Sequence, residues 1–322
     1  MDQIQSMRAF IRVVEAGTFT KAADSLSLPK GTVTKQIQSL ESRLRLKLLN
    51  RTTRRVTVTT DGAAYYERAA RLINDLDDME SSMTNSQAAP QGRLRVDVGS
   101  SVARLVIIPA LHTFYERFPD IQLHLGVSDR PADLMTENID CVIRAGELSD
   151  QSLVARRIGN VGFATVATPQ YLERFGIPRH PSEIEAMHYM VGYFSPRTNR
   201  IITQDFLKGS EHIDFIGRNR ICVNESNAHI AATLAGLGVA QAVRFLADPH
   251  LRNNELIELL PEWERPPLPI YVVYPPNRHL SAKVRAFVDW AAELFSGLPH
   301  LQVERPMSDV ARADSRASGV LT

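Results

Sequence analysis

Threonine and lysine recur on the polar positions of residues 18–40, TFTKAADSLSLPKGTVTKQIQSL. The apolar positions between them have the spacing of two short helices, and they are Ala22, Ala23, Leu26, Val33, Ile37 and Leu40. Hydroxyl and ammonium groups on the outer face of a helix can reach the base edges and phosphates of a DNA major groove about 12 Å wide. The stretch therefore predicts a helix-turn-helix with a DNA-reading second helix, over about residues 32–46.

The side chains expected to touch DNA follow from this chemistry. Threonine suits thymine methyls and hydrogen-bonding base edges, whereas lysine and arginine suit phosphate oxygens or guanine. A ribbon after the second helix, with Val56 and Val58 alternating with threonine, would form a wing against the DNA backbone or minor groove. The predicted contacts are Lys30, Thr32, Thr34 and Lys35 on the helix and Arg51, Arg54 and Arg55 beside the ribbon.

The charge of the chain is distributed unevenly. Residues 1–60 contain eleven lysines and arginines but only four acids, although the whole 322-residue chain has a net charge of only +1. A basic N-terminal segment joined to an acidic remainder is typical of a chain in which one module binds a polyanion and the other does not. A merely solvated basic face is the alternative, and the coincidence of the charge with the helix-turn-helix pattern argues against it.

Three helices and a ribbon must hold these side chains. Residues 3–15 place Ile4, Met7, Phe10, Ile11 and Val14 on one face of an amphipathic helix. Gly17 would end that helix and Thr18 would cap the next, while Pro29 and Gly31 mark the break before the third. Asp61 and Gly62 end the ribbon, and Thr60 is expected to cap the helix that follows.

A long helix is predicted over about residues 60–87, because no glycine or proline follows Gly62 there. Its apolar residues recur at alternating spacings of four and three, as in the seam of a coiled coil. We expect them to pair two copies of the chain; packing of the seam on its own domain is the alternative. They are Tyr65, Ala69, Leu72, Leu76, Met79 and Met83. The polar residues 85–92 then read as a hinge.

From residue 93 the pattern alternates between strands and helices. Strands are expected near 94–101, 121–127, 140–146, 161–168, 214–223 and 269–275, and helices near 104–119, 228–238 and 282–295. This alternation predicts an α/β class with a mostly parallel sheet, and its length favours two lobes around a cleft. The domains are then 1–59 for DNA binding, 60–92 for the linker helix and hinge, 93–300 for the effector, and 301–322 for a disordered tail.

Polar residues follow several predicted strands at the edge where ligands bind in open α/β sheets. A helix starting after residue 224 could also hold a carboxylate at its N-terminus. Ordinary capping is the alternative for each serine and asparagine, and half of a structural ion pair is the alternative for the arginine. Tyr193 and Phe194 with the cleft arginines favour an aromatic or anionic ligand. The candidate effector residues are Ser100, Ser101, Ser128, Asp129, Arg144, Asn224 and Ser226.

Other classes of protein find little support in the chain. It contains no P-loop, CxxC, HExxH or GxSxG motif, and its nine histidines lack metal-ligand spacing, so neither an enzyme nor a cofactor is expected. Cys141 and Cys222 lie apart in apolar contexts and are expected to be free thiols rather than a disulfide or a nucleophile. Without a signal peptide or an apolar run of about 18 residues, the chain is expected in the cytoplasm.

The chain resembles the LysR-type transcriptional regulators over about residues 1–300. The resemblance rests on TFTKAADSL, PKGTVTKQIQSLE and LLNRTTRRVTVTTDG in the first 62 residues, then on GRLRV, AGLGVA and PIYVVYPP. The RTTRR block also resembles the branch with regulators of pilus and virulence genes. By motif, the resemblance assigns DNA contacts to Lys30, Gly31, Thr34 and Lys35 and to Arg54 or Arg55.

What the resemblance implies is a winged helix-turn-helix, a linker-helix dimer and a two-lobed domain like those of periplasmic binding proteins. Such regulators bind interrupted palindromes in double-stranded DNA as dimers or tetramers, and a small effector in the cleft changes the assembly. The competing hypothesis is a ligand-binding α/β module whose basic head anchors it to DNA without sequence specificity.

Overall fold

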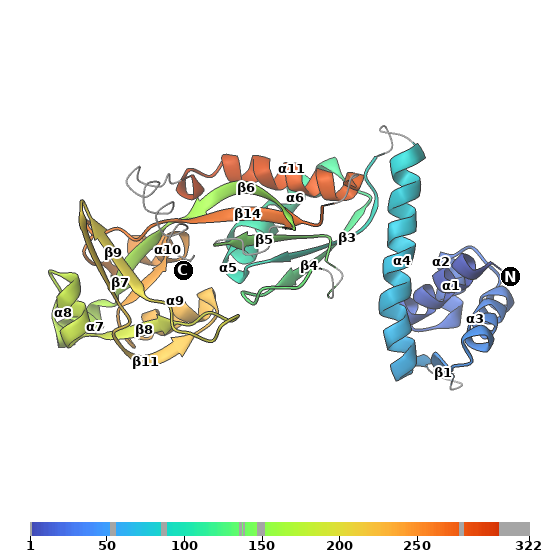
Figure 1. Cartoon of the computed structure of the whole chain (residues 1–322), viewed down its shortest axis with the longest axis horizontal. Coiled ribbons are helices and arrows are strands. Elements are labelled where there is room, and N and C mark those ends of the chain that lie inside the picture. The colour runs from blue at the N-terminus through green and yellow to red at the C-terminus, as the bar shows by residue number, and fades with distance from the viewer. Residues whose placement is uncertain are drawn as a thin grey trace, which may run out of the picture. The chain divides into compact units, whose positions relative to one another are not determined.

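The computed structural model describes residues 2–51, 56–84, 89–134, 137, 139–146, 152–276 and 280–302. The chain forms two compact units, Met1–Ala89 and Pro90–Thr322 (Figure 1). Met1 and residues 303–322 of the predicted tail lie outside the described residues, as do parts of the wing and of the hinge, whereas Leu301, the first residue of that tail, is ordered and buried. No helix within the described ranges combines the length and the apolar character needed to cross a membrane.

The first unit begins with three helices, α1 Gln3–Ala16, α2 Phe19–Ser25 and α3 Lys30–Leu44. As predicted, Gly17 ends α1 in the left-handed conformation at φ 68°, and the Thr18 hydroxyl caps α2 by accepting from the Lys21 amide. The predicted start of α3 near residue 32 was wrong by two residues. Pro29 occupies the N-cap with extended backbone, so the helix begins at Lys30.

A short antiparallel ribbon follows, formed by β1 Leu49–Arg51 and β2 Val56–Val58. It leads directly into the long helix α4 Thr60–Thr84. The cap of α4 is Thr59 and not the predicted Thr60, because the Thr59 hydroxyl accepts from the Gly62 amide at 2.9 Å. Gly62 permits a close approach, since a Cβ there would lie 2.1 Å from the Leu48 carbonyl oxygen.

The core of the first unit lies between these helices and the ribbon. Its buried residues come from every element of the predicted helix-turn-helix, and they are Ala9, Phe10, Val13, Ala22, Ala23, Val33, Ile37, Leu40, Leu48 and Leu49. The first turns of α4 close this core, because the ring of Tyr65 packs edge-on against Phe10 with centroids 5.7 Å apart. The small core therefore fixes the angle between α1 and α3.

The second unit contains two lobes. Lobe 1, residues 92–161 and 268–302, is built on a five-stranded sheet in the order β4-β3-β5-β14-β6. Its strands are β3 Gly92–Val98, β4 Ile121–Val127, β5 Cys141–Ala145, β6 Val154–Val161 and β14 Leu268–Tyr274. Its helices are α5 Ser100–Val102, the π-helical turn η1 Ala103–Ile107, α6 Ile108–Arg117, α11 Ala282–Ser296 and the 3-10 turn η2 Pro299–Leu301.

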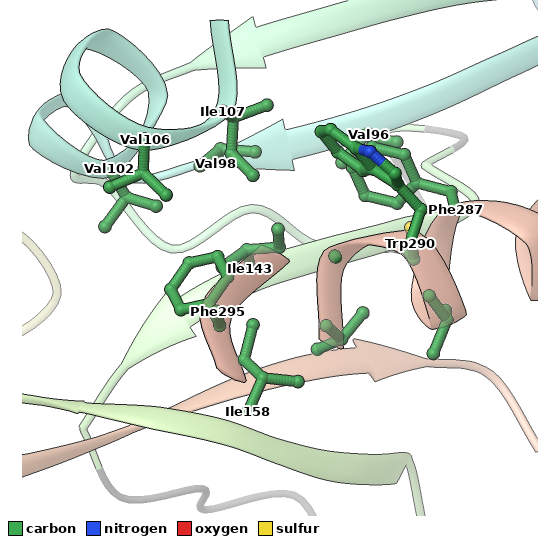
Figure 2. Close-up of a cluster of buried hydrophobic side chains, with 14 of the residues drawn as sticks. Val96, Val98, Val102, Val106, Ile107, Ile143, Ile158, Phe287, Trp290 and Phe295 are labelled. Carbon is green, nitrogen blue, oxygen red and sulfur yellow. The ribbon is translucent and has the colours of Figure 1, made fainter. Parts of the chain in front are cut away.

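The core of lobe 1 lies between one face of this sheet and its helices. Val96 and Val98 of β3, Ile143 of β5 and Ile158 of β6 meet side chains from α11, among them the ring of Phe295 (Figure 2). The Trp290 indole N–H donates to the Thr113 hydroxyl at 2.9 Å, which joins α11 to α6. This packing holds the helix that starts at Ser100 firmly against the sheet.

Lobe 2, residues 163–264, contains shorter strands. Its strands are β7 Phe163–Ala167, β8 Tyr189–Tyr193, β9 Gln204–Lys208, β10 Glu211–Phe215, β11 Arg218–Val223, β12 Ala240–Val243 and β13 Ile257–Glu258. Its helices are α7 Pro169–Phe175, α8 Pro181–Met187, α9 Ser226–Leu234 and α10 Arg244–Arg252. β7 pairs with β12 and β13, β8 pairs with β11, and a bridge between Met190 and Val239 joins these sets.

The prediction of a mostly parallel sheet was only partly right. β3 pairs in parallel with β4 and β5, and β8 with β11, but β14 is antiparallel to both of its neighbours. The reason is that the chain crosses to lobe 2 after β6 and returns from the opposite direction into β14. The pattern along the sequence missed these crossings, and with them the strands β6, β8, β9, β12 and β13 and the helices α7, α8 and α10.

Candidate nucleic-acid interface and interlobe site

The outer face of α3 presents the side chains that were predicted to read DNA. Lys30, Gly31 and Lys35 are exposed, whereas Thr32 and Thr34 are half-buried. The Thr34 hydroxyl donates to the Lys30 carbonyl at 2.9 Å, which leaves its methyl group and its lone pairs available outward. The opposite face of α3 is buried in the core. α3 therefore displays a continuous polar and basic surface on a rigid support.

A buried carboxylate fixes the ribbon to α3. Glu41 accepts hydrogen bonds from the backbone amides of Leu48 and Leu49 at 2.9 and 3.2 Å, and Lys47 lies 3.7 Å away. These bonds satisfy amide groups that the tight turn after α3 would otherwise leave unpaired. Sequence reasoning missed Glu41, because a charged residue near the end of an amphipathic helix usually faces solvent.

The wing is described only at its base. Arg51 is the last residue of β1, and the structure does not describe its side chain. Arg54 and Arg55 lie outside the described residues. Their predicted contact with DNA stays a prediction.

The predicted seam of α4 divides into two parts. Tyr65 and Ala69 pack on α1, together with Ile73. For these positions the alternative holds, in which the seam packs on its own domain. Leu72 and Met79 are instead 54% and 52% exposed, and Leu76 is half-buried. The side chain of Met83 lies outside the described residues. Two large apolar side chains of this long helix are thus more than half exposed.

Between the two lobes, the Asp129 carboxylate accepts hydrogen bonds from both sides. The backbone N–H and the hydroxyl of Ser100, at the start of α5, each donate to Oδ1 at 2.7 Å. The backbone N–H of Ser226, at the start of α9 in lobe 2, donates to Oδ2 at 2.7 Å. Burial opposes the charge of Asp129, but these hydrogen bonds outweigh it and lower the pKa of the carboxyl.

A second carboxylate meets the same serine. The Glu225 carboxylate also contacts the Ser100 hydroxyl, whose single proton it shares with Asp129, and it caps α9 by accepting from the amides of Asn227 and Ala228 at 2.9 and 2.7 Å. The single hydroxyl proton of Tyr193 is shared between two acceptors, the Asn224 carbonyl at 3.2 Å and the Asp129 carboxylate at 3.4 Å. Burial and the nearby Asp129 raise the pKa of Tyr193, so its phenol stays protonated. We call Ser100, Asp129, Tyr193, Glu225 and Ser226 the interlobe network.

Of the other candidate effector residues, Asn224 contacts this network through its carbonyl, whereas the contacts of Arg144 and Ser128 lie elsewhere. The guanidinium of Arg144 pairs with Asp97 on the neighbouring strand and donates to the Arg130 carbonyl, which matches the ion-pair alternative. Burial raises the pKa of Asp97 although Arg144 opposes the shift. The Ser128 hydroxyl accepts from the Arg130 amide in a local turn. Ser101 is buried and Asn224 is exposed.

Two members of the network were missed or undervalued in the sequence. Glutamate is not among the preferred N-cap residues, so the sequence did not predict that Glu225 caps the helix beginning at Ser226. The contact of Asp129 with lobe 2 spans 97 residues and has no local signature. The cysteines behave as predicted, because Cys141 and Cys222 are both free thiols and burial raises the pKa of each.

Both units match models of known protein families. Residues 4–63 match the bacterial regulatory helix-turn-helix protein, lysR family, and residues 87–296 match the LysR substrate binding domain. The two matches together span nearly all of the described chain.

Relatives along the whole chain agree with these matches. An HTH-type transcriptional repressor of Pseudomonas aeruginosa is 38% identical over 94% of this chain and 95% of its own. The full-length Vibrio cholerae virulence activator AphB is similar in structure, with a TM-score of 0.58, 30% identity, and coverage of 91% and 99% of the two chains. CrgA from Neisseria meningitidis gives a TM-score of 0.58 and 29% identity, with coverage of 90% and 98%.

Proposed function

Because this chain belongs to the LysR family of bacterial transcriptional regulators, we propose that it reads operator DNA through the outer face of α3. The observation that carries the proposal is the exposed basic and polar surface of that helix, backed by a fully buried apolar face. Lys30 and Lys35 would contact phosphates or guanine, and Thr32 and Thr34 would contact base edges. Gly31 leaves room for the helix to approach the DNA, since no atom lies within 4 Å of its Cβ position.

The proposal includes a homodimer held by α4. Leu72 and Met79 are large apolar side chains in solvent, and their spacing is that of a coiled-coil seam. A dimer would present two copies of α3 to an interrupted palindrome, with half-sites separated by whole turns of about 10–10.5 base pairs. Assembly of dimers into a tetramer is a further part of the proposal that rests on the family.

The second unit carries the effector in this proposal. The family description of residues 87–296 as a substrate binding domain supports a small molecule, and the interlobe network joins the two lobes at a place where closure could be sensed. Binding there would change how the lobes sit against each other. As a DNA-bound regulator, the protein would act in the cytoplasm.

A footprint on DNA tests the proposal. Hydroxyl-radical cleavage of the intergenic region upstream of this gene, with full-length protein, should give two protected half-sites on one face of the helix. Lys30→Ala with Lys35→Ala should abolish that pattern at the same protein concentration. A single unpaired footprint, or uniform protection without boundaries, would contradict the proposal.

A further inference from the structure

The helices α3 and α4 are joined by hydrogen bonds to one buried residue of the turn between them, Leu48. α3 ends at Leu44 and α4 begins at Thr60, and the ribbon lies between them in the sequence. Leu48 immediately precedes the ribbon and is fully buried. Its backbone amide is bonded to α3, and its carbonyl is bonded to the cap of α4. This residue therefore connects the proposed DNA-reading helix to the proposed dimer helix.

The bond from α3 comes from a buried carboxylate. Glu41 is 5% exposed, and its Oε1 accepts from the amides of Leu48 at 2.9 Å and Leu49 at 3.2 Å. Its backbone carbonyl also accepts from the Leu46 amide at 3.2 Å. Leaving a buried amide without an acceptor is unfavourable, so these bonds hold the turn in one position on α3.

The bonds from α4 come from its capping threonine. The Thr59 amide donates to the Leu48 carbonyl at 3.0 Å, and the single hydroxyl proton of Thr59 is shared between the carbonyls of Lys47 at 2.7 Å and Leu48 at 3.2 Å. The same hydroxyl oxygen accepts from the Gly62 amide in the first turn of α4. Leu48 is thus held from both sides, by the end of α3 and by the start of α4.

A second connection between the two helices runs through α1 and is mostly apolar. Ala69 and Ile73 of α4 pack on α1, and the Tyr66 hydroxyl donates to Glu15 at 3.2 Å on the surface. α1 also shares the core of the first unit with α3. Apolar contact is not directional, so it fixes an angle less narrowly than hydrogen bonds do. Without the bonds at Leu48, α4 could therefore pivot on α1.

The length of α3 makes this angle important on DNA. Lys30, at the far end of α3, lies about 16 Å along the helix from Glu41, because each residue of a helix rises about 1.5 Å. A rotation of about 12° at Leu48 would therefore move Lys30 by about 3.4 Å, which is the rise of one base pair. Both protomers of a dimer would contribute such a shift. The half-site spacing that a dimer accepts thus depends on how firmly Leu48 is held.

We propose that Glu41 is a positioning residue for DNA recognition, which sets the spacing between half-sites by fixing α3 to α4 through Leu48. Its carboxylate bonds the turn inside the unit and does not contact DNA itself. The proposal rests on the proposed function, since it takes α3 as the DNA reader and α4 as the dimer helix. It goes further by assigning the choice of spacing to a buried node, formed by Glu41, Leu48 and Thr59, instead of to the side chains that contact DNA.

Binding to a series of operator spacings tests this role. The footprint on the upstream intergenic DNA defines the two half-sites, and duplexes are made with the interval unchanged, one base pair longer and one base pair shorter. Full-length wild type should prefer the unchanged interval by about tenfold or more in anisotropy titrations. Glu41→Met has no acceptor and should reduce this preference by about threefold or more, whereas Glu41→Gln keeps an acceptor oxygen and should retain it.

The ratio of affinities separates positioning from general damage, because a less stable protein binds every duplex more weakly by the same factor. Thr59→Val removes the hydroxyl bonds on the α4 side and should also relax the spacing, which decides the question if Glu41→Met does not fold. Asp2→Ala is the control. It removes another helix cap of this unit, where the Asp2 carboxylate accepts from the Ile4 amide at 2.9 Å, and should keep the wild-type ratio.

The outcomes distinguish this inference from the proposed function. A wild-type ratio in Glu41→Met or Thr59→Val, when the variant is folded, would overturn the inference alone. So would equal relaxation by Asp2→Ala, or specific binding by wild type that is indifferent to the interval. No specific binding by wild type to any of these duplexes would contradict the proposed function and the inference together.

Discussion

Replacing Asp129 with asparagine would test whether the interlobe network stabilises the second unit. The substitution keeps the size of the side chain but turns one acceptor oxygen into an N–H₂ donor. The remaining oxygen can serve the amide and hydroxyl of Ser100, both at 2.7 Å, or the amide of Ser226, also at 2.7 Å. One lobe is therefore left with a donor that faces another donor.

The expected loss in the free energy of unfolding follows from the charge of the lost acceptor. A hydrogen bond to a charged group contributes about 1.5–3 kcal/mol, so Asp129→Asn should reduce the free energy of unfolding by about 2–3 kcal/mol at pH 7. For a domain of this size that corresponds to a melting temperature lower by about 5–10 °C. Asp289→Asn is the control, because its exposed pair with Arg156 should contribute no more than about 1 kcal/mol.

The lowered pKa of Asp129 also predicts how its contribution to the stability of the fold changes with pH. The pKa of Asp129 is lower in the folded protein than in the unfolded chain, so its ionised form stabilises the fold above the unfolded pKa. This stability is lost as the pH falls through the folded pKa. Differential scanning calorimetry from pH 7 to pH 3 should therefore show the gap between wild type and Asp129→Asn shrinking below about pH 4. Equal melting temperatures at pH 7, or a gap that grows on acidification, would refute the reasoning.

Three further substitutions probe the first unit. Lys35→Ala should weaken operator binding and reduce the slope of affinity against salt by about one, as measured by fluorescence anisotropy. Leu72→Glu should convert the dimer to monomer in sedimentation velocity, because it places a charge on an exposed seam position. Gly62→Ala should destabilise the unit by about 1–3 kcal/mol in urea unfolding, because its Cβ would lie 2.1 Å from the Leu48 carbonyl oxygen.

Matched controls separate these effects from general damage. Lys208→Ala removes a surface lysine of the other unit, and equal loss of operator binding would discount Lys35. Ile177→Glu charges an apolar residue that is 64% exposed in lobe 2, and a dimer that survives Leu72→Glu but not this change would exclude the α4 seam. Gly31→Ala meets no atom within 4 Å and should not destabilise; loss equal to that of Gly62→Ala would contradict the close-approach argument.

The features that depend on local pattern could be predicted from the sequence, whereas those that depend on long-range contacts could not. The apolar spacing of residues 18–40 predicted the outer face of α3, and Gly17 and Thr18 predicted the helix ends. Contacts between residues that are remote in the sequence carry no such local pattern. The antiparallel entry of β14 and the reach of Asp129 to Ser226 likewise follow from chain crossings that no short window contains.

Specific recognition of DNA is the central claim, and an anisotropy titration tests it most directly. Full-length protein would be titrated at physiological salt into two labelled duplexes of equal length, the intergenic DNA upstream of this gene and a scrambled sequence. A specific regulator should prefer the first by about 10³-fold or more. Equal binding to both duplexes, repeated for the other intergenic regions of the locus, would contradict the account and favour a basic head that only anchors the chain to DNA.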